Sequence, residues 1–83
     1  MIRKPVFLHT LEILGKIIAT ERARIPLTQQ ELADLAEVSR TSVQRLEEGK
    51  EATFSTIVKI LRVLNLMLII DTYQKEEQIE NDR

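Results

Sequence analysis

Hydrogen-bonding side chains recur at helical spacing in the middle of the chain, at Arg40, Thr41, Gln44 and Arg45. Arginine can donate two hydrogen bonds to guanine O6 and N7, glutamine can pair with adenine N6 and N7, and a threonine methyl group can pack on thymine. Each bidentate pair discriminates between bases by roughly 1–3 kcal/mol. Side chains of these types are consistent with hydrogen bonding to nucleic acid, provided that a helix presents them to solvent.

The elements that would position them lie in residues 27–49, LTQQELADLAEVSRTSVQRLEEG, which are typical of two short helices joined by a tight turn. Thr28 and Glu31 form a capping box, so the first helix should start at Gln29. Its apolar face would be Leu32, Ala33, Leu35 and Ala36. Ser39 can cap the second helix, which would bury Val43 and Leu46 and end at Gly49.

The spacing within this segment fits a helix-turn-helix. Counted from Gln29, small Ala33 is fifth, where two helices cross closely, and apolar Val43 and Leu46 are fifteenth and eighteenth, where the second helix must be held. Position nine, in the turn, usually favours glycine for a positive φ but is Glu37 here, at a cost of roughly 1 kcal/mol. The alternative is a pair of ordinary packed helices.

Size and composition indicate one small helical domain. The chain has 83 residues, of which 43% are hydrophobic and 30% charged, with two glycines and two prolines. So short a chain buries a limited share of its surface, and this favours stabilisation by a partner chain. There is no cysteine, which excludes disulfides and cysteine-based metal sites. We find no signal peptide and no run long enough to span a membrane, and expect a cytoplasmic protein.

The charge is unevenly distributed. The formal net charge is −1, yet residues 71–83 hold five acids and two bases, which leaves ten bases and eight acids in residues 1–70. The part that would face DNA is therefore mildly basic, and binding to phosphates depends on the local field rather than on the total charge. We expect moderate affinity with strong salt dependence.

The flanking segments complete a predicted all-α bundle of four or five helices. Residues 1–7 would be an arm, and an amphipathic helix is predicted from about Val6 or Leu8 to Arg24, ended by the residue before Pro26. Gly15 within it suggests close packing against a neighbouring element. A further helix, capped by Thr53 and running to about Leu64 with Asn65 at its end, would bury Phe54, Ile57, Ile60, Leu61 and Leu64.

A short apolar run follows at Leu66, Met67, Leu68, Ile69 and Ile70. Its composition suits a buried strand, which needs a partner for its backbone groups. We expect the same strand of a second copy, related by a two-fold axis. The alternatives are a continuation of the preceding helix or an irregular core segment. Residues 71–83 are predicted to be a charged, flexible tail.

Other chemistries find little support in the sequence. His9 is the single histidine and has no acidic cluster around it at metal-ligand spacing. The serines have no recognisable base, and the two glycines stand apart, so neither nucleophilic catalysis nor a phosphate-binding loop is indicated. We therefore expect neither an enzyme nor a cofactor or metal.

Residues 14–70 resemble the Xre/Cro-type helix-turn-helix family with its lambda-repressor-like fold, through the motif LTQQELADLAEVSRTSVQRLEEG. The following ATFSTIVKILRVLNLMLIID is similar to HipB-like antitoxins, in which the strand closes a homodimer. The resemblance implies that Gln29 contacts a DNA phosphate and that Arg45 reaches the backbone. It places base edges opposite Ser39, Arg40, Thr41 and Gln44. It also implies an interior salt bridge between Arg22 and Glu47.

The function that this resemblance implies is that of a homodimeric regulator binding an inverted-repeat operator. Within that class it favours the antitoxin of a type II toxin–antitoxin pair, which represses its own operon and binds a toxin such as a HipA-like Ser/Thr kinase. A stand-alone or phage-type Xre repressor is the alternative. A protein-interaction module that does not read DNA is another, favoured by the acids Glu37, Glu47, Glu48 and Glu51 close to the second helix of the motif.

Overall fold

Side-chain caps divide the described part of the chain, residues 10–70 of a computed structural model, into four helices. These are α1 Leu11–Arg24, α2 Gln29–Ala36, α3 Arg40–Glu47 and α4 Phe54–Val63, and no strand is present within residues 10–70. Each helix starts after a hydroxyl side chain that accepts a hydrogen bond from the backbone N–H three residues later, at Thr10, Thr28, Ser39 and Thr53. The caps predicted at Thr28, Ser39 and Thr53 are thus confirmed.

The prediction for the first helix was wrong at its start. α1 begins at Leu11 rather than near Val6 or Leu8, because Thr10 has an extended backbone and its Oγ1 accepts from Ile13 N at 3.2 Å. Its end at Arg24 agrees with expectation, but Ile25 keeps right-handed helical angles (φ −65°, ψ −33°). Pro26 has no N–H to continue the ladder, and Leu27 N donates to Arg22 O at 2.8 Å instead. The expected arm, residues 1–7, lies outside the described residues.

The turn between α2 and α3 has the predicted geometry. Thr28 and Glu31 form both hydrogen bonds of the capping box, at 3.0 and 2.8 Å. Glu37 has φ 59° and ψ 45°, the left-handed conformation in which glycine is usually found. The chain can therefore reverse direction at once and start α3 after Ser39.

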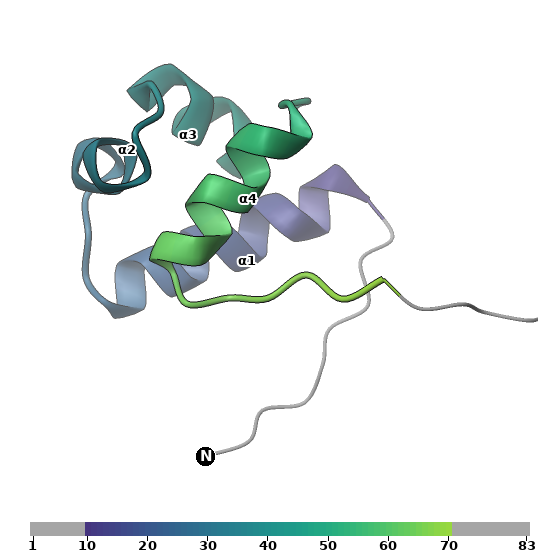
Figure 1. Ribbon diagram of the computed structural model, residues 1–83, viewed down its shortest axis with the longest axis horizontal. Helices are drawn as coiled ribbons and strands as arrows, with labels where there is room; N and C mark the ends of the chain where they lie inside the picture. Colours follow the sequence, from purple (N-terminus) through teal and green to yellow (C-terminus); the bar gives the residue numbers. More distant parts are fainter. Residues whose placement is uncertain (1–9, 71–83) are drawn as a thin grey trace, which may run out of the picture.

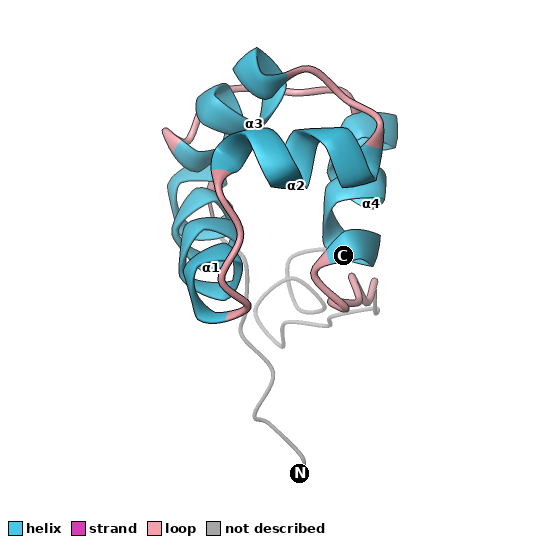
Figure 2. Cartoon of the chain, turned by 90° about the vertical axis from the view of Figure 1, so that its left-hand side faces the viewer, coloured by secondary structure: helices cyan, strands magenta, loops and turns pink. Residues whose placement is uncertain are grey.

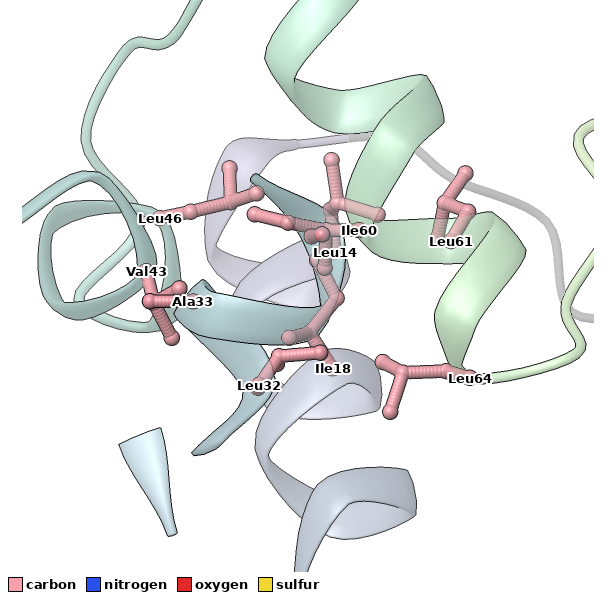
Figure 3. Close-up of a cluster of buried hydrophobic side chains, with 10 residues drawn as sticks. Leu14, Ile18, Leu32, Ala33, Val43, Leu46, Ile60, Leu61 and Leu64 are labelled. Carbon is pink, nitrogen blue, oxygen red and sulfur yellow. The ribbon is translucent and has the colours of Figure 1, made fainter. Parts of the chain in front are cut away.

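The four helices are arranged as two outer helices bridged by the helix-turn-helix pair. Figure 2 shows α1 and α4 on opposite sides, with α2 and α3 lying across them, and the contacts run from α1 to α3, from α3 to α2 and from α2 to α4. The space between them is filled by one apolar cluster (Figure 3), comprising Leu14, Ile18, Leu32, Ala33, Ala36, Val43, Leu46, Ile60, Leu61 and Leu64. No side chain in this cluster is polar, so the core holds the helices by apolar packing alone.

Two residues predicted to be buried lie at the surface instead. Leu35 is 60% exposed and Phe54 is 62% exposed. Leu35 falls between Ala33 and Ala36 on α2, which has only a narrow buried face in a helix of eight residues. Phe54 is the first residue of α4, beyond the end of the cluster, so none of the helices within residues 10–70 covers its ring.

Gly15 has the close-packing role expected from the sequence. A Cβ atom at this position would stand 2.5 Å from Leu46 O and 2.8 Å from Glu47 O. Both are backbone atoms of α3, which cannot move aside independently of the helix. Glycine therefore allows α1 to contact the end of α3 directly, and this fixes the helix that carries the candidate base-reading side chains.

The segment after α4 leaves the helical body. Leu64 ends the helix, Asn65 adopts φ 59°, and Leu66 N donates to Leu61 O at 2.8 Å, a closing turn that ends helices. Figure 1 shows residues 66–70 running away from the end of α4 as an extended trace. Leu66 packs against the core, whereas Met67, Ile69 and Ile70 are 82%, 73% and 84% exposed.

This segment therefore does not continue α4, and apart from Leu66 its side chains are exposed. The predicted strand is not formed within the described residues 10–70. Residues 71–83, predicted to be a flexible tail, lie outside the described residues.

Candidate DNA-binding surface

The outward face of α3 carries the polar side chains singled out in the sequence. Arg40, Thr41, Gln44 and Arg45 are exposed. Their side chains have no hydrogen-bond or ion-pair partner among residues 10–70. Ser39, also exposed, lies one residue before the helix, and its Oγ accepts from Ser42 N at 3.0 Å and lies 2.9 Å from Ser42 Oγ. The face is thus open to an external ligand, with Ser39 already engaged in capping.

The opposite face of α3 is fully buried. Val43 and Leu46 are 0% exposed and pack in the shared cluster, where Figure 3 shows them next to Ala33 of α2. A large residue at position 33 would push the two helices apart, because the alanine side chain is itself 0% exposed. The eight-residue α3 is too short to be stable alone, so this packing both stabilises the helix and sets its orientation.

An ion pair ties α3 to the first helix. Arg22 Nε donates to Glu47 Oε2 at 2.6 Å and Arg22 Nη2 donates to Glu47 Oε1 at 3.1 Å, a bidentate arrangement. Arg22 Nη1 donates to Leu27 O at 2.8 Å. The two side chains are only 20% and 8% exposed, so the pair is largely buried. The Nε, Nη1 and Nη2 atoms of the guanidinium each donate one hydrogen bond within the protein, which uses three of its five N–H groups.

The pair also raises the pKa of Arg22. The hydrogen bond to Glu47 is the largest cause, burial opposes it, and the charge of Glu47 adds to it. A basic group with a raised pKa contributes stability at every pH below its ordinary value, and this contribution is lost only above it. The arginine therefore stays charged throughout the pH range in which proteins are handled.

Gln29 lies at the start of α2 and joins this pair. Its Nε2 donates to Glu47 Oε1 at 3.0 Å, and the side chain is half-buried. The sequence offered no signal for this contact, because the two residues are 18 positions apart and belong to helices whose relative placement depends on the whole core. The structure thus brings Gln29, Arg22 and Glu47 together beside α3, whereas the base-facing candidates project separately from its outer surface.

Acidic side chains border this surface. Glu37, Glu48 and Glu51 are exposed, and Glu48 pairs with Lys50 at 3.2 Å. The Lys50–Glu48 pair is exposed on both sides and contributes little to stability. Among residues 10–70 there is no group of three or more His, Cys, Asp or Glu side chains that could hold a metal ion. In the same residues, every helix is too short or too polar to cross a membrane.

Comparison with known proteins places this geometry in a family. The sequence profile of the family described as Helix-turn-helix matches residues 18–67, which is more than half of the chain. The chain belongs to the helix-turn-helix family. It is accordingly a DNA-binding regulator rather than an enzyme. No curated protein matches this helix-turn-helix chain.

Solved structures share the fold of this helix-turn-helix protein. A HipB variant in an O2 20mer complex is similar over 86% of this chain and 100% of its own, with a TM-score of 0.75 and 21% sequence identity. A HipA-HipB-O2-O3 complex is similar over 83% of this chain and 99% of the matched chain, with a TM-score of 0.73 and 21% identity. A structure described as MDT protein has the same TM-score, coverage and identity as the latter.

Proposed function

We propose that this chain is the antitoxin of a type II toxin–antitoxin pair, a homodimer that represses its own operon and binds a toxin such as a HipA-like Ser/Thr kinase. The observation that carries the DNA-binding part is the outer face of α3, where Arg40, Thr41 and Gln44 are exposed and unpartnered while Val43 and Leu46 hold the helix from beneath. The antitoxin part rests on the likeness in fold to a HipB–O2 20mer complex and a HipA-HipB-O2-O3 complex.

The positions of the side chains support the proposed DNA contacts. Arg40, Thr41 and Gln44, with Ser39 at the helix start, face base edges in the major groove, since the exposed side of a recognition helix is the one that enters it. Arg45, further along α3, reaches the DNA backbone. Gln29 donates to a phosphate from the start of α2. Phosphate contacts set the orientation of the protein on the duplex, and base contacts supply sequence preference.

The segment after α4 supports the proposed dimer. Met67, Ile69 and Ile70 expose large apolar side chains on an extended backbone whose N–H and C=O groups have no ladder partner within residues 10–70. Pairing of residues 66–70 with the same residues of a second copy buries these apolar side chains and gives the backbone groups hydrogen-bond partners. Two copies then present their α3 helices to half-sites about 34 Å apart, or a multiple of that distance.

The test is a comparison of two duplexes of equal length by fluorescence anisotropy. One carries the DNA immediately upstream of the gene and the other a mixed sequence. We expect the upstream duplex to bind about 1,000-fold more tightly or better, with both affinities falling as salt rises. Equal binding of the two duplexes contradicts autoregulation, and no binding to either at low salt favours the interaction module. Co-purification with the product of the adjacent gene tests the toxin part.

A further inference from the structure

One carboxylate connects three helices beside the candidate DNA surface. Glu47, at the end of α3, accepts from Arg22 Nε and Nη2 of α1 and from Gln29 Nε2 of α2. Glu47 Oε1 is shared, at 3.1 Å from Arg22 and 3.0 Å from Gln29. The ion pair therefore does more than anchor α3, because it also holds a side chain at the first turn of α2.

This contact fixes which way the Gln29 amide faces. An ionised carboxylate only accepts hydrogen bonds, so it must meet the NH2 group of the amide and not its carbonyl oxygen. Glu47 accepts one of the two amide hydrogens, and the second has no acceptor among residues 10–70, which leaves it for an acceptor outside the protein. A glutamine without such a partner could equally present its carbonyl oxygen, which would repel a phosphate.

The negative charge of Glu47 is balanced by the positive charge of Arg22. The bidentate guanidinium of Arg22 lies against the same carboxylate, and no other anion lies within bonding distance of it among residues 10–70. A phosphate approaching Gln29 thus meets a balanced pair rather than a bare negative charge. Glu47 can therefore orient the Gln29 amide without repelling the DNA phosphates.

We propose that Glu47 is a positioning residue for a DNA-backbone contact: through its hydrogen bond it turns the free N–H of Gln29 toward a phosphate oxygen. This inference rests on the proposed DNA-binding function but is separate from base reading, since a phosphate contact carries no sequence information. A role confined to stability predicts instead that Glu47 and Gln29 act on DNA binding independently.

The experiment measures affinity for a mixed-sequence duplex at low salt, on the full chain, in a double-mutant cycle. The variants are Gln29→Ala, Glu47→Gln and both together, with Gln30→Ala as the matched control. Gln30 also donates to a carboxylate, Asp34 Oδ1 at 2.8 Å, but within α2 and at an exposed site. The double replacement Arg22→Gln/Glu47→Gln, which leaves no unpaired charge, replaces Glu47→Gln if that single variant fails to fold.

We expect Gln29→Ala to weaken binding about 3- to 10-fold, the effect of losing one hydrogen bond, and Glu47→Gln to weaken it by up to the same factor, because an amide at position 47 no longer fixes which way the Gln29 amide faces. The combined variant should bind no more weakly than Gln29→Ala alone. The Gln29 side-chain amide resonances should shift in Glu47→Gln, and Gln30→Ala should bind like the wild type. Additive losses, or an unmoved Gln29 amide, overturn the positioning role while leaving the proposed function intact. Failure of the wild-type protein to bind any duplex overturns both.

Discussion

Replacing Glu47 with alanine is expected to lower the free energy of unfolding by about 3 to 5 kcal/mol, because removal of one partner of a largely buried ion pair leaves the other uncompensated. Arg22 would keep its charge at 20% side-chain exposure with no remaining anionic partner among residues 10–70, and Gln29 would lose its acceptor. Urea unfolding followed by circular dichroism, at one fixed protein concentration, measures the change.

The neighbouring carboxylate provides the control for this prediction. Glu48 pairs with Lys50 at 3.2 Å, but the two side chains are 50% and 56% exposed, so Glu48→Ala should change the free energy of unfolding by less than about 1 kcal/mol. Similar midpoints for Glu47→Ala, Glu48→Ala and the wild type would contradict the structural account of the Arg22–Glu47 pair.

Ending the chain at Leu66 is expected to convert the proposed dimer to a monomer and to weaken binding to the upstream duplex by about 100-fold or more, since each half-site would then be bound separately. Leu66 is kept because it packs against the core and its N–H donates to Leu61 O at 2.8 Å. The residues removed from the described part contribute exposed side chains, so the helices should retain their circular dichroism signal.

A chain ending at Ile70 is the matched control, because it removes the charged segment 71–83 and retains the proposed strand. Sedimentation equilibrium should give twice the chain mass for this control and a single chain mass for the shorter protein. A dimer that survives truncation at Leu66 would show that another surface joins the two copies and would remove the basis for the strand pairing.

The caps and the turn of this fold could be predicted from the sequence because they depend on neighbours. Thr28 with Glu31, Ser39 and Thr53 each satisfy backbone groups three residues away, whatever the rest of the chain does. The same holds for Glu37. Only three residues separate the end of α2 from the start of α3, and so tight a turn requires a left-handed conformation at Glu37. The start of α1 was predicted less well. The apolar pattern in the sequence continues before Thr10, but the Thr10 side chain caps α1 and the helix begins at Leu11.

Side-chain surroundings could not be predicted where they depend on how the helices meet. Leu35 and Phe54 have the right residue type for a core, but no facing helix covers them. The hydrogen bond from Gln29 to Glu47 needs α1, α2 and α3 all in place, and neither local spacing nor composition indicates it. The proposed strand pairing of residues 66–70 depends on a second chain. A single sequence and a single chain indicate only that the backbone of this segment requires a partner.

The most direct test of the account is whether the outer face of α3 reads sequence. Arg40→Ala and Gln44→Ala should each weaken binding to the upstream duplex by about 5- to 150-fold, the effect of one lost bidentate base contact, while binding to the mixed-sequence duplex changes little. Arg45 is proposed to contact the DNA backbone from the same helix, so Arg45→Ala should weaken binding to both duplexes by the same factor. Equal losses on both duplexes for Arg40→Ala and Gln44→Ala, or no loss on either, would contradict base reading by α3.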